Sequence, residues 1–213
     1  MKKGRAGTKQ EPPARTRADQ KRRAEQTARR RRGAGLLAIV LVAGGVGYCV
    51  MNERALTGAL TTATYPAGQH ASSPLTYRET PPLGGVHHPV WQNCGIYDVP
   101  VHNEHAVHSL EHGAVWITYR PGLAADAIDR LKAMASDDFM LLSPYPGLQA
   151  PVVASAWNHQ IELDGADDPR LRQFITRYKN NPSTTPEFGA SCFGGTSATA
   201  AMPLGNVGAG SMK

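Results

Sequence analysis

The longest apolar stretch of the chain lies near its N-terminus, at residues 33–51, where 19 consecutive residues carry no charge. A helix of that length spans about 28 Å, which is close to the thickness of the hydrocarbon core of a bilayer. The pattern therefore predicts a transmembrane helix, which we place at residues 34–51. A cleaved signal sequence is the alternative, because residues 59–63 are loosely compatible with a late cleavage site.

Beyond this stretch, segments with the apolar pattern of a strand are interleaved with segments that have the period of a helix. Runs of β-branched and aromatic residues predict strands at residues 114–119, 139–142, 152–157 and 160–163. The last two runs form either one strand or a broken pair. Helical spacing predicts amphipathic helices at residues 124–136 and from residue 168 onward. This order predicts an α+β fold in which two helices pack on a small mixed β-sheet.

A loop-rich lobe and a short helix precede these elements. Residues 80–89 are dense in Pro and Gly, which exclude a helix or a central strand and predict a Pro/Gly-rich loop lobe. Asn103 can cap a short helix that ends near His112, and Gly113 follows at a position where helices often end.

Composition sets the limits of the folded unit at residues 76–193. Residues 52–75 are rich in Ala, Thr, Ser, Gly and Pro, and we expect a flexible stalk there. Residues 194–213 are rich in Gly, Ala and Ser, and we expect a disordered C-terminal tail. Residues 1–33 carry runs of Arg and Lys without an apolar period, so we expect a disordered basic tail.

The formal charge of +6 is unevenly distributed, because residues 1–33 hold 13 Lys and Arg against 3 Asp and Glu. The remainder is mildly acidic, which argues against a nucleic-acid-binding domain. Basic residues before the apolar stretch and few after it predict a cytoplasmic N-terminus and a domain outside the plasma membrane. The expected partners are the lipid bilayer at residues 34–51 and anionic lipid at the basic tail, with no specific nucleic acid.

The three cysteines suggest one disulfide. Cys49 lies in the predicted span, where it serves as a small apolar residue. Cys94 and Cys192 flank the folded unit, and both would face an oxidising compartment. A disulfide between them would close a loop of nearly 100 residues and contribute about 4 to 5 kcal/mol in the chain-entropy model. The competing hypothesis makes Cys94 a thiolate ligand beside the histidines.

Six of the eight histidines fall within 26 residues: His87, His88, His102, His105, His108 and His112. On a helix, His105, His108 and His112 would share one face, and the last two could present two imidazole nitrogens to one metal ion. His87 in the rigid loop is the candidate third ligand. Glu111 could serve as a ligand, as a group that orients an imidazole, or as a general base. Imidazole suits both Zn²⁺ and Cu²⁺.

Residues 108–112 also match H-x-x-E-H, the inverted zinc-protease motif. Two features weaken a hydrolase interpretation. Gly113 ends the helix at the motif, and the downstream acids are poor third ligands because they lie at a turn or in a Pro/Thr-rich stretch. These acids are Asp164, Asp167, Asp168 and Glu187. We therefore lean against an enzyme without deciding the question.

Two stretches, residues 80–97 and 106–121, resemble a bacterial family catalogued as domain of unknown function 3105. Its pattern G-x-H-x-P-x-W falls on Gly85, His87, Pro89 and Trp91. Its pattern V-H-x-L-E-H-G falls on Val107, His108, Leu110, Glu111, His112 and Gly113. The resemblance covers roughly residues 76–193 and implies a short membrane-anchored protein with an extracytoplasmic domain. It places His88, His102 and His105 at variable positions, and it implies no activity.

The leading hypothesis is a single-span protein of the cell envelope whose outer domain binds a transition metal, copper or zinc. The expected ligands are His87, His108 and His112, with Glu111 close by. The first alternative is an interaction or structural module in which the histidines form an ordered polar core without a metal. The second alternative is the metal hydrolase.

Overall fold

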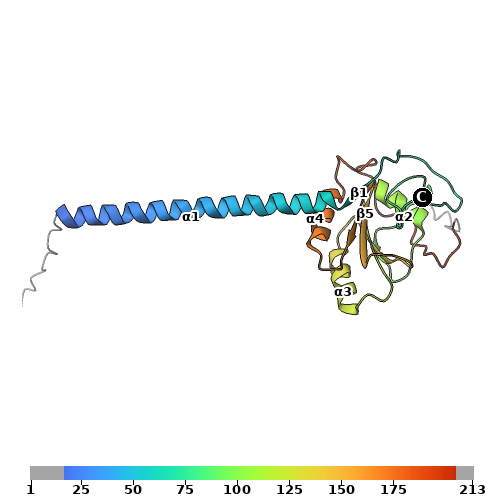
Figure 1. Ribbon diagram of the computed structural model, residues 1–213. Coiled ribbons are helices and arrows are strands. Elements are labelled where there is room, and N and C mark those ends of the chain that lie inside the picture. The colour runs from blue at the N-terminus through green and yellow to red at the C-terminus, as the bar shows by residue number, and fades with distance from the viewer. Residues whose placement is uncertain (1–16, 205–213) are drawn as a thin grey trace, which may run out of the picture. The chain divides into compact units, whose positions relative to one another are not determined.

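The computed structural model of the chain describes residues 17–204 (Figure 1). It divides into two compact units, Met1–Met51 and Asn52–Lys213. Helix α1 (Arg17–Gly58) supplies the described part of the first unit and runs into the second. Within the described residues, it is the one helix long and apolar enough to cross a membrane.

Helix α1 is longer than the predicted span. It begins at Arg17, so the described part of the predicted disordered tail is helical, while residues 1–16 lie outside the described residues. The physical reason is that Arg, Ala, Gln and Lys all have high helix propensity, and the apolar stretch that follows extends the same helix.

The second unit is built on a six-stranded mixed sheet. Its strands are β1 (Leu60–Thr62), β2 (Gly95–Ile96), β3 (Val115–Tyr119), β4 (Met140–Pro144), β5 (Val152–Ala156) and β6 (His159–Leu163). Their order is β1-β6-β5-β3-β4-β2. Strands β2, β4 and β3 run parallel, while β5, β6 and β1 pair antiparallel. The mixed sheet and the α+β class are confirmed, and the two runs after residue 151 form an antiparallel hairpin.

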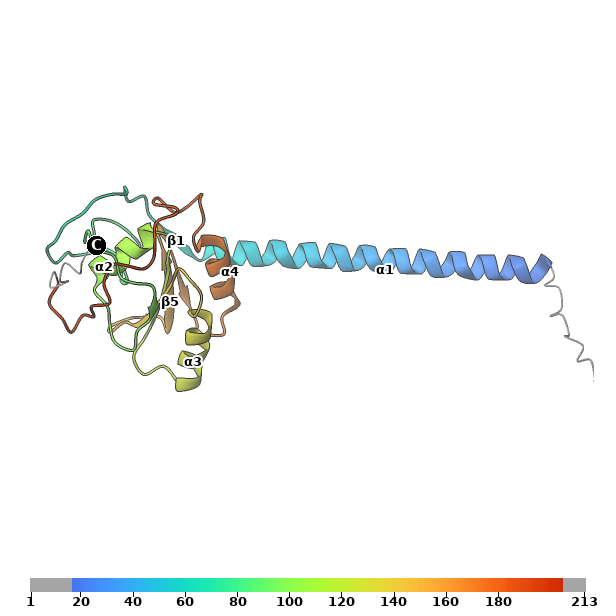
Figure 2. The same ribbon diagram turned by 180° about the vertical axis from the view of Figure 1, so that it is seen from behind.

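Helices cover both faces of this sheet (Figures 1 and 2). Helices α3 (Ala125–Met134) and α4 (Pro169–Tyr178) pack on one face, where Ile117, Leu131 and Phe174 belong to one buried core. Helix α2 (Asn103–Glu111) packs on the other face, against Trp116. Adjacent residues of β3 point to opposite faces of the sheet, so Ile117 enters the core under α3 and α4 while Trp116 enters the core under α2.

The N-terminus of α2 differs from the prediction. His102, without a capping side-chain bond, occupies the N-cap position. Asn103 does not cap the helix, because its Nδ2 donates to the Tyr145 hydroxyl at 3.2 Å. At the other end His112 is the C-cap residue and Gly113 has a φ of +99°, so the predicted stop is confirmed.

The prediction of a flexible stalk at residues 52–75 is wrong, because much of this segment packs on the domain. Leu56 is fully buried in the core, and β1 pairs with β6. The prediction of a disordered C-terminal tail is also wrong for residues 194–204, the part that the structure describes. Thr196 and Thr199 form bridges with Gln92 and Val101. Composition did not reveal these contacts because short polar segments can dock through backbone hydrogen bonds alone.

Replacing Gly113 by alanine is expected to destabilise the domain more than replacing Gly122. Both glycines have a positive φ, of +99° and +90°, which strains any L-residue by about 1 to 2 kcal/mol. A Cβ on Gly113 would also meet the Thr185 side chain at 2.9 Å and the Asn180 backbone at 3.1 Å, whereas Gly122 faces open space. Urea unfolding of the two full-length variants in detergent measures the difference, and equal losses would contradict the close packing.

Candidate metal centre

Three separate segments bring histidines together on the α2 face of the sheet. The last turn of α2 carries His108 and Glu111, and His112 caps it. The Pro/Gly-rich lobe lays His87 against this turn. The segment predicted as a stalk runs beside the lobe, because a parallel bridge joins His70 to His87 and the Ala71 N–H donates to the His87 carbonyl at 2.8 Å.

The imidazole rings of His87, His108 and His112 form a row. The ring centroids of His87 and His108 lie 4.7 Å apart, and those of His108 and His112 lie 4.6 Å apart. All three side chains are buried, whereas His70 is exposed and its ring lies 4.8 Å from His87 and 5.1 Å from His108. The ring of Trp91 packs on His108 and His112.

Each ring in the row uses its Nδ1 atom in the same way. Nδ1 of His87 lies 2.8 Å from the Gly85 carbonyl oxygen. Nδ1 of His108 lies 2.7 Å from the carbonyl of His88, and Nδ1 of His112 lies 2.7 Å from that of Ser191. A carbonyl oxygen only accepts, so each Nδ1 carries the proton and donates it. In the neutral imidazole the lone pair is then on Nε2, which is the arrangement typical of metal-binding histidines.

Glu111 faces His87 across the interior. Its Oε2 lies 2.8 Å from Nε2 of His87, and both side chains are fully buried. The distance is that of a hydrogen bond, yet neither atom has a partner with hydrogen-bond geometry. At that separation the Nε2 lone pair and the carboxylate lone pair would repel each other. A proton on one of the two atoms, or a cation bound to both, would remove this repulsion.

A second carboxylate stands at the other end of the row. Oε2 of Glu187 lies 3.1 Å from Nε2 of His112, and the Glu187 side chain is 43% exposed. The backbone N–H of Glu187 donates to the Glu111 carbonyl at 3.1 Å, which fixes this loop beside α2. The row thus has one carboxylate at each end and His108 in the middle.

These side chains form two overlapping sets of candidate ligands. The His70 group consists of His70, His87, His108 and Glu111, and the Glu187 group consists of His108, His112 and Glu187. Within each group, the ligand atoms lie within 4.8 Å of one another. His108 belongs to both. The ligands expected from the sequence therefore do not all converge on one point. His87 and Glu111 lie in one group, and His112 lies in the other.

Sequence reasoning missed two members of these groups. His70 lies in the segment predicted as a flexible stalk, where a lone histidine has no pattern to support it. The Pro/Thr-rich surroundings of Glu187 predict a poor ligand. The nearest signal was the spacing of Glu187 from Cys192, since a disulfide to the domain would hold this loop in place.

Ionisation favours ligand binding at two members of the His70 group. Burial lowers the pKa of His108 to about 3, so its imidazole is neutral at physiological pH. Burial alone would raise the pKa of Glu111, but the contacts with His87 and with the Gly68 N–H outweigh it and leave the pKa below its usual value. A neutral imidazole and an ionised carboxylate are the forms that bind a cation.

The other histidines of the cluster lie outside both groups. His105 donates from Nδ1 to the Val90 carbonyl at 2.6 Å, and its ring packs on His88 at 4.4 Å. His102 contacts the Met202 carbonyl at 2.8 Å. Cys94 is not free to serve as a thiolate ligand, because it lies at disulfide distance from Cys192, with 5.4 Å between the Cα atoms.

The H-x-x-E-H hydrolase arrangement is not the one observed. That mechanism needs His108, His112 and Glu111 to act around one ion, with the glutamate activating a water molecule. Glu111 instead points toward His87 and is fully buried, and its Oε1 accepts the Gly68 N–H at 2.6 Å. The structure thus places Glu111 and His112 in different groups and not around one ion.

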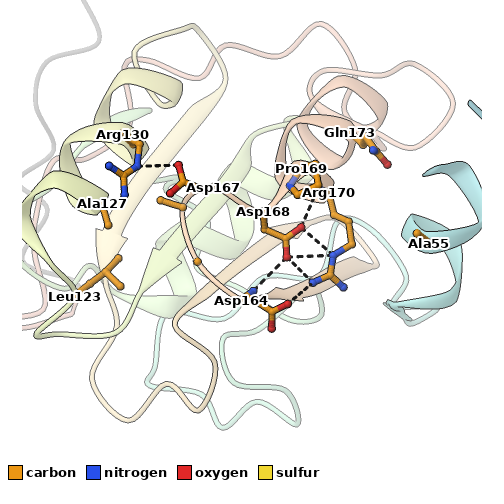
Figure 3. Close-up of a pocket in the computed structure, with 12 residues that line it drawn as sticks. Ala55, Leu123, Ala127, Arg130, Asp164, Asp167, Asp168, Pro169, Arg170 and Gln173 are labelled. Carbon is orange, nitrogen blue, oxygen red and sulfur yellow. Dashed lines mark hydrogen bonds and ion pairs between the residues drawn. The ribbon is translucent and has the colours of Figure 1, made fainter. Parts of the chain in front are cut away.

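A pocket of about 710 Å³ on the α3 and α4 side of the domain contains no residue of either group (Figure 3). Its charged side chains pair with one another, Arg170 with Asp164 and Asp168, and Arg130 with Asp167. The pocket therefore offers no unpaired charge among the residues that line it, and we place the candidate site at the histidines.

Comparison with known proteins identifies a family to which this chain is similar. A family model described as "Protein of unknown function (DUF3105)" matches residues 69–194, which is more than half of the chain. The matched range includes every member of the two groups. No curated protein and no solved structure matches the chain.

Proposed function

The chain belongs to the DUF3105 family of proteins of unknown function, and from this premise and the geometry of its histidines we propose that it is a membrane-anchored protein that binds a transition metal. The His70 group is the binding site. One observation carries the proposal: Nε2 of His87 and Oε2 of Glu111 face each other at 2.8 Å in a fully buried space, where their lone pairs require a cation or a proton.

The donor set indicates which metals fit. Three imidazole nitrogens and one carboxylate oxygen suit Zn²⁺ and Cu²⁺, and the group includes no sulfur ligand that would favour Cu⁺. The backbone carbonyls that accept from Nδ1 of His87 and His108 fix the orientation of these two rings. Four protein ligands fill a tetrahedral site, which favours binding or handling of the ion over catalysis at an open position.

Metal content of the full-length chain, purified in detergent, tests the proposal. We expect about one equivalent of zinc or copper in the wild type by mass spectrometry, and at least about a hundredfold weaker binding in Glu111→Gln. Glutamine keeps the size of the side chain and can still accept the Gly68 N–H, so folding should be preserved.

Glu104→Gln is the matched control for this experiment. Glu104 lies on the same helix, is 7% exposed, and likewise accepts a backbone N–H, from Leu75 at 2.9 Å, but it belongs to neither group. A folded wild type that takes up neither ion would favour the alternative function, a structural module in which His87 and Glu111 contact each other without a metal. Equal losses in the two variants would also contradict the proposed site.

We also propose that the domain lies outside the plasma membrane, with residues 34–51 of α1 as a single span and the basic tail in the cytoplasm near anionic lipid. The apolar stretch and the 13 Lys and Arg of residues 1–33 support this orientation. A reporter that folds only in an oxidising compartment, fused after the last residue, should be active. Activity of the same reporter fused before the first residue would contradict the orientation.

A further inference from the structure

The two ligand groups share His108, and this sharing suggests how an ion would reach the buried site. An imidazole with its Nδ1 proton donated to the His88 carbonyl has one lone pair, on Nε2. His108 can therefore complete only one group at a time. The two groups are alternative positions for a single ion and not a pair of sites that fill together.

The two positions differ in depth and in number of ligands. The His70 group has four ligands, and its carboxylate, Glu111, is fully buried. The Glu187 group has three, and its carboxylate is 43% exposed. More ligands and a desolvated carboxylate make the His70 group the tighter position. Each group has one exposed ligand, His70 in the first and Glu187 in the second. Of these two, Glu187 is a carboxylate, so a cation arriving from solvent is drawn first to the Glu187 group.

We propose that the Glu187 group is a loading position from which a divalent transition-metal ion passes to the His70 group, with His108 as the pivot. This inference rests on the proposed metal-binding function. In the transfer the bonds from the ion to His112 and Glu187 break and those to His87, Glu111 and His70 form, while the His108 ring turns so that its Nε2 stays bound to the ion. The oxidation state of the ion does not change, and a proton held between His87 and Glu111 leaves to solvent.

The surroundings of the row support such a transfer. The rings of His87, His108 and His112 follow one another at 4.7 and 4.6 Å, so the ion never has to leave the line of imidazoles. The indole of Trp91 packs on His108 and His112, with ring centroids 5.7 and 4.8 Å away, and supports this part of the row. The hydrogen bond from the Glu187 N–H to the Glu111 carbonyl holds the Glu187 loop beside the last turn of α2, which carries Glu111.

Kinetics of Zn²⁺ loading test the proposal on the full-length chain in detergent, with a chelator that changes colour as it gives up the ion. Two variants affect one group each at an exposed side chain, Glu187→Gln and His70→Ala. The wild type should take up one ion. Glu187→Gln should also take up one ion with an affinity within about threefold of the wild type, but should load and unload at least about tenfold more slowly.

His70→Ala should show the opposite behaviour, with loading at nearly the wild-type rate and an affinity at least about tenfold lower. Loading of Glu187→Gln at the wild-type rate would overturn the relay and leave the proposed function intact. Two ions per chain, or an equal loss of affinity in both variants, would also overturn it. A wild type that takes up no ion would contradict the proposed function itself, so the two failures are distinguishable.

Discussion

Replacing His108 by alanine is expected to reduce metal affinity by about two to three orders of magnitude, the largest effect of any single ligand. A four-ligand zinc site is worth about 10 to 16 kcal/mol, so one ligand accounts for about 2.5 to 4 kcal/mol. His108 belongs to both groups, so no alternative position for the ion remains after its loss. Titration of the full-length chain with Zn²⁺ and Cu²⁺ against a competing chelator measures the change.

His105→Ala is the matched control for this variant. His105 lies one turn earlier on α2, is fully buried, and makes the same kind of bond, from Nδ1 to the Val90 carbonyl at 2.6 Å. Both substitutions leave a cavity and an unpaired carbonyl, so both should lower the free energy of unfolding by about 1 to 3 kcal/mol. Only His108→Ala should lose the metal. Retention of metal by His108→Ala would contradict both groups at once.

The regular elements of the domain could be predicted because each had its own local signal. The strand β3 is a run of β-branched and aromatic residues, and α4 begins at an Asp-Pro pair in which the Asp168 side chain accepts the Arg170 N–H. The strands β1 and β2 carried no such signal, because they are only three and two residues long. Their pairing depends on neighbouring strands that are distant in the sequence.

The candidate site could be predicted only in part. Helical spacing correctly placed His108 and His112 near each other, but it could not show that Glu111 turns toward His87 while His112 turns toward Glu187. The partners that orient the rings are backbone carbonyls, which every residue possesses and which no sequence pattern marks. His70 was missed for a related reason, since its position beside His87 is set by backbone hydrogen bonds of the lobe.

Removal of both Cys94 and Cys192 is expected to cost about 4 to 5 kcal/mol of stability. The two residues are 98 positions apart in the sequence and lie at disulfide distance, so oxidation closes a long loop. For a chain of this size the loss corresponds to a fall in Tm of about 10 to 15 °C. Thermal unfolding of Cys94→Ala/Cys192→Ala in a Cys49→Ala background measures it, and the wild type treated with reductant should show the same fall.

The same double variant also bears on the metal centre. Cys192 follows Ser191, whose carbonyl accepts from Nδ1 of His112, and Cys94 donates its N–H to the Cys192 carbonyl at 2.9 Å. Loss of the disulfide should therefore loosen the Glu187 group and slow metal loading, while the affinity of the His70 group changes by less than about threefold. If Cys94 were instead a thiolate ligand, the variant would lose affinity by about a hundredfold and keep its thermal stability. The two outcomes separate a structural disulfide from a ligand at this position.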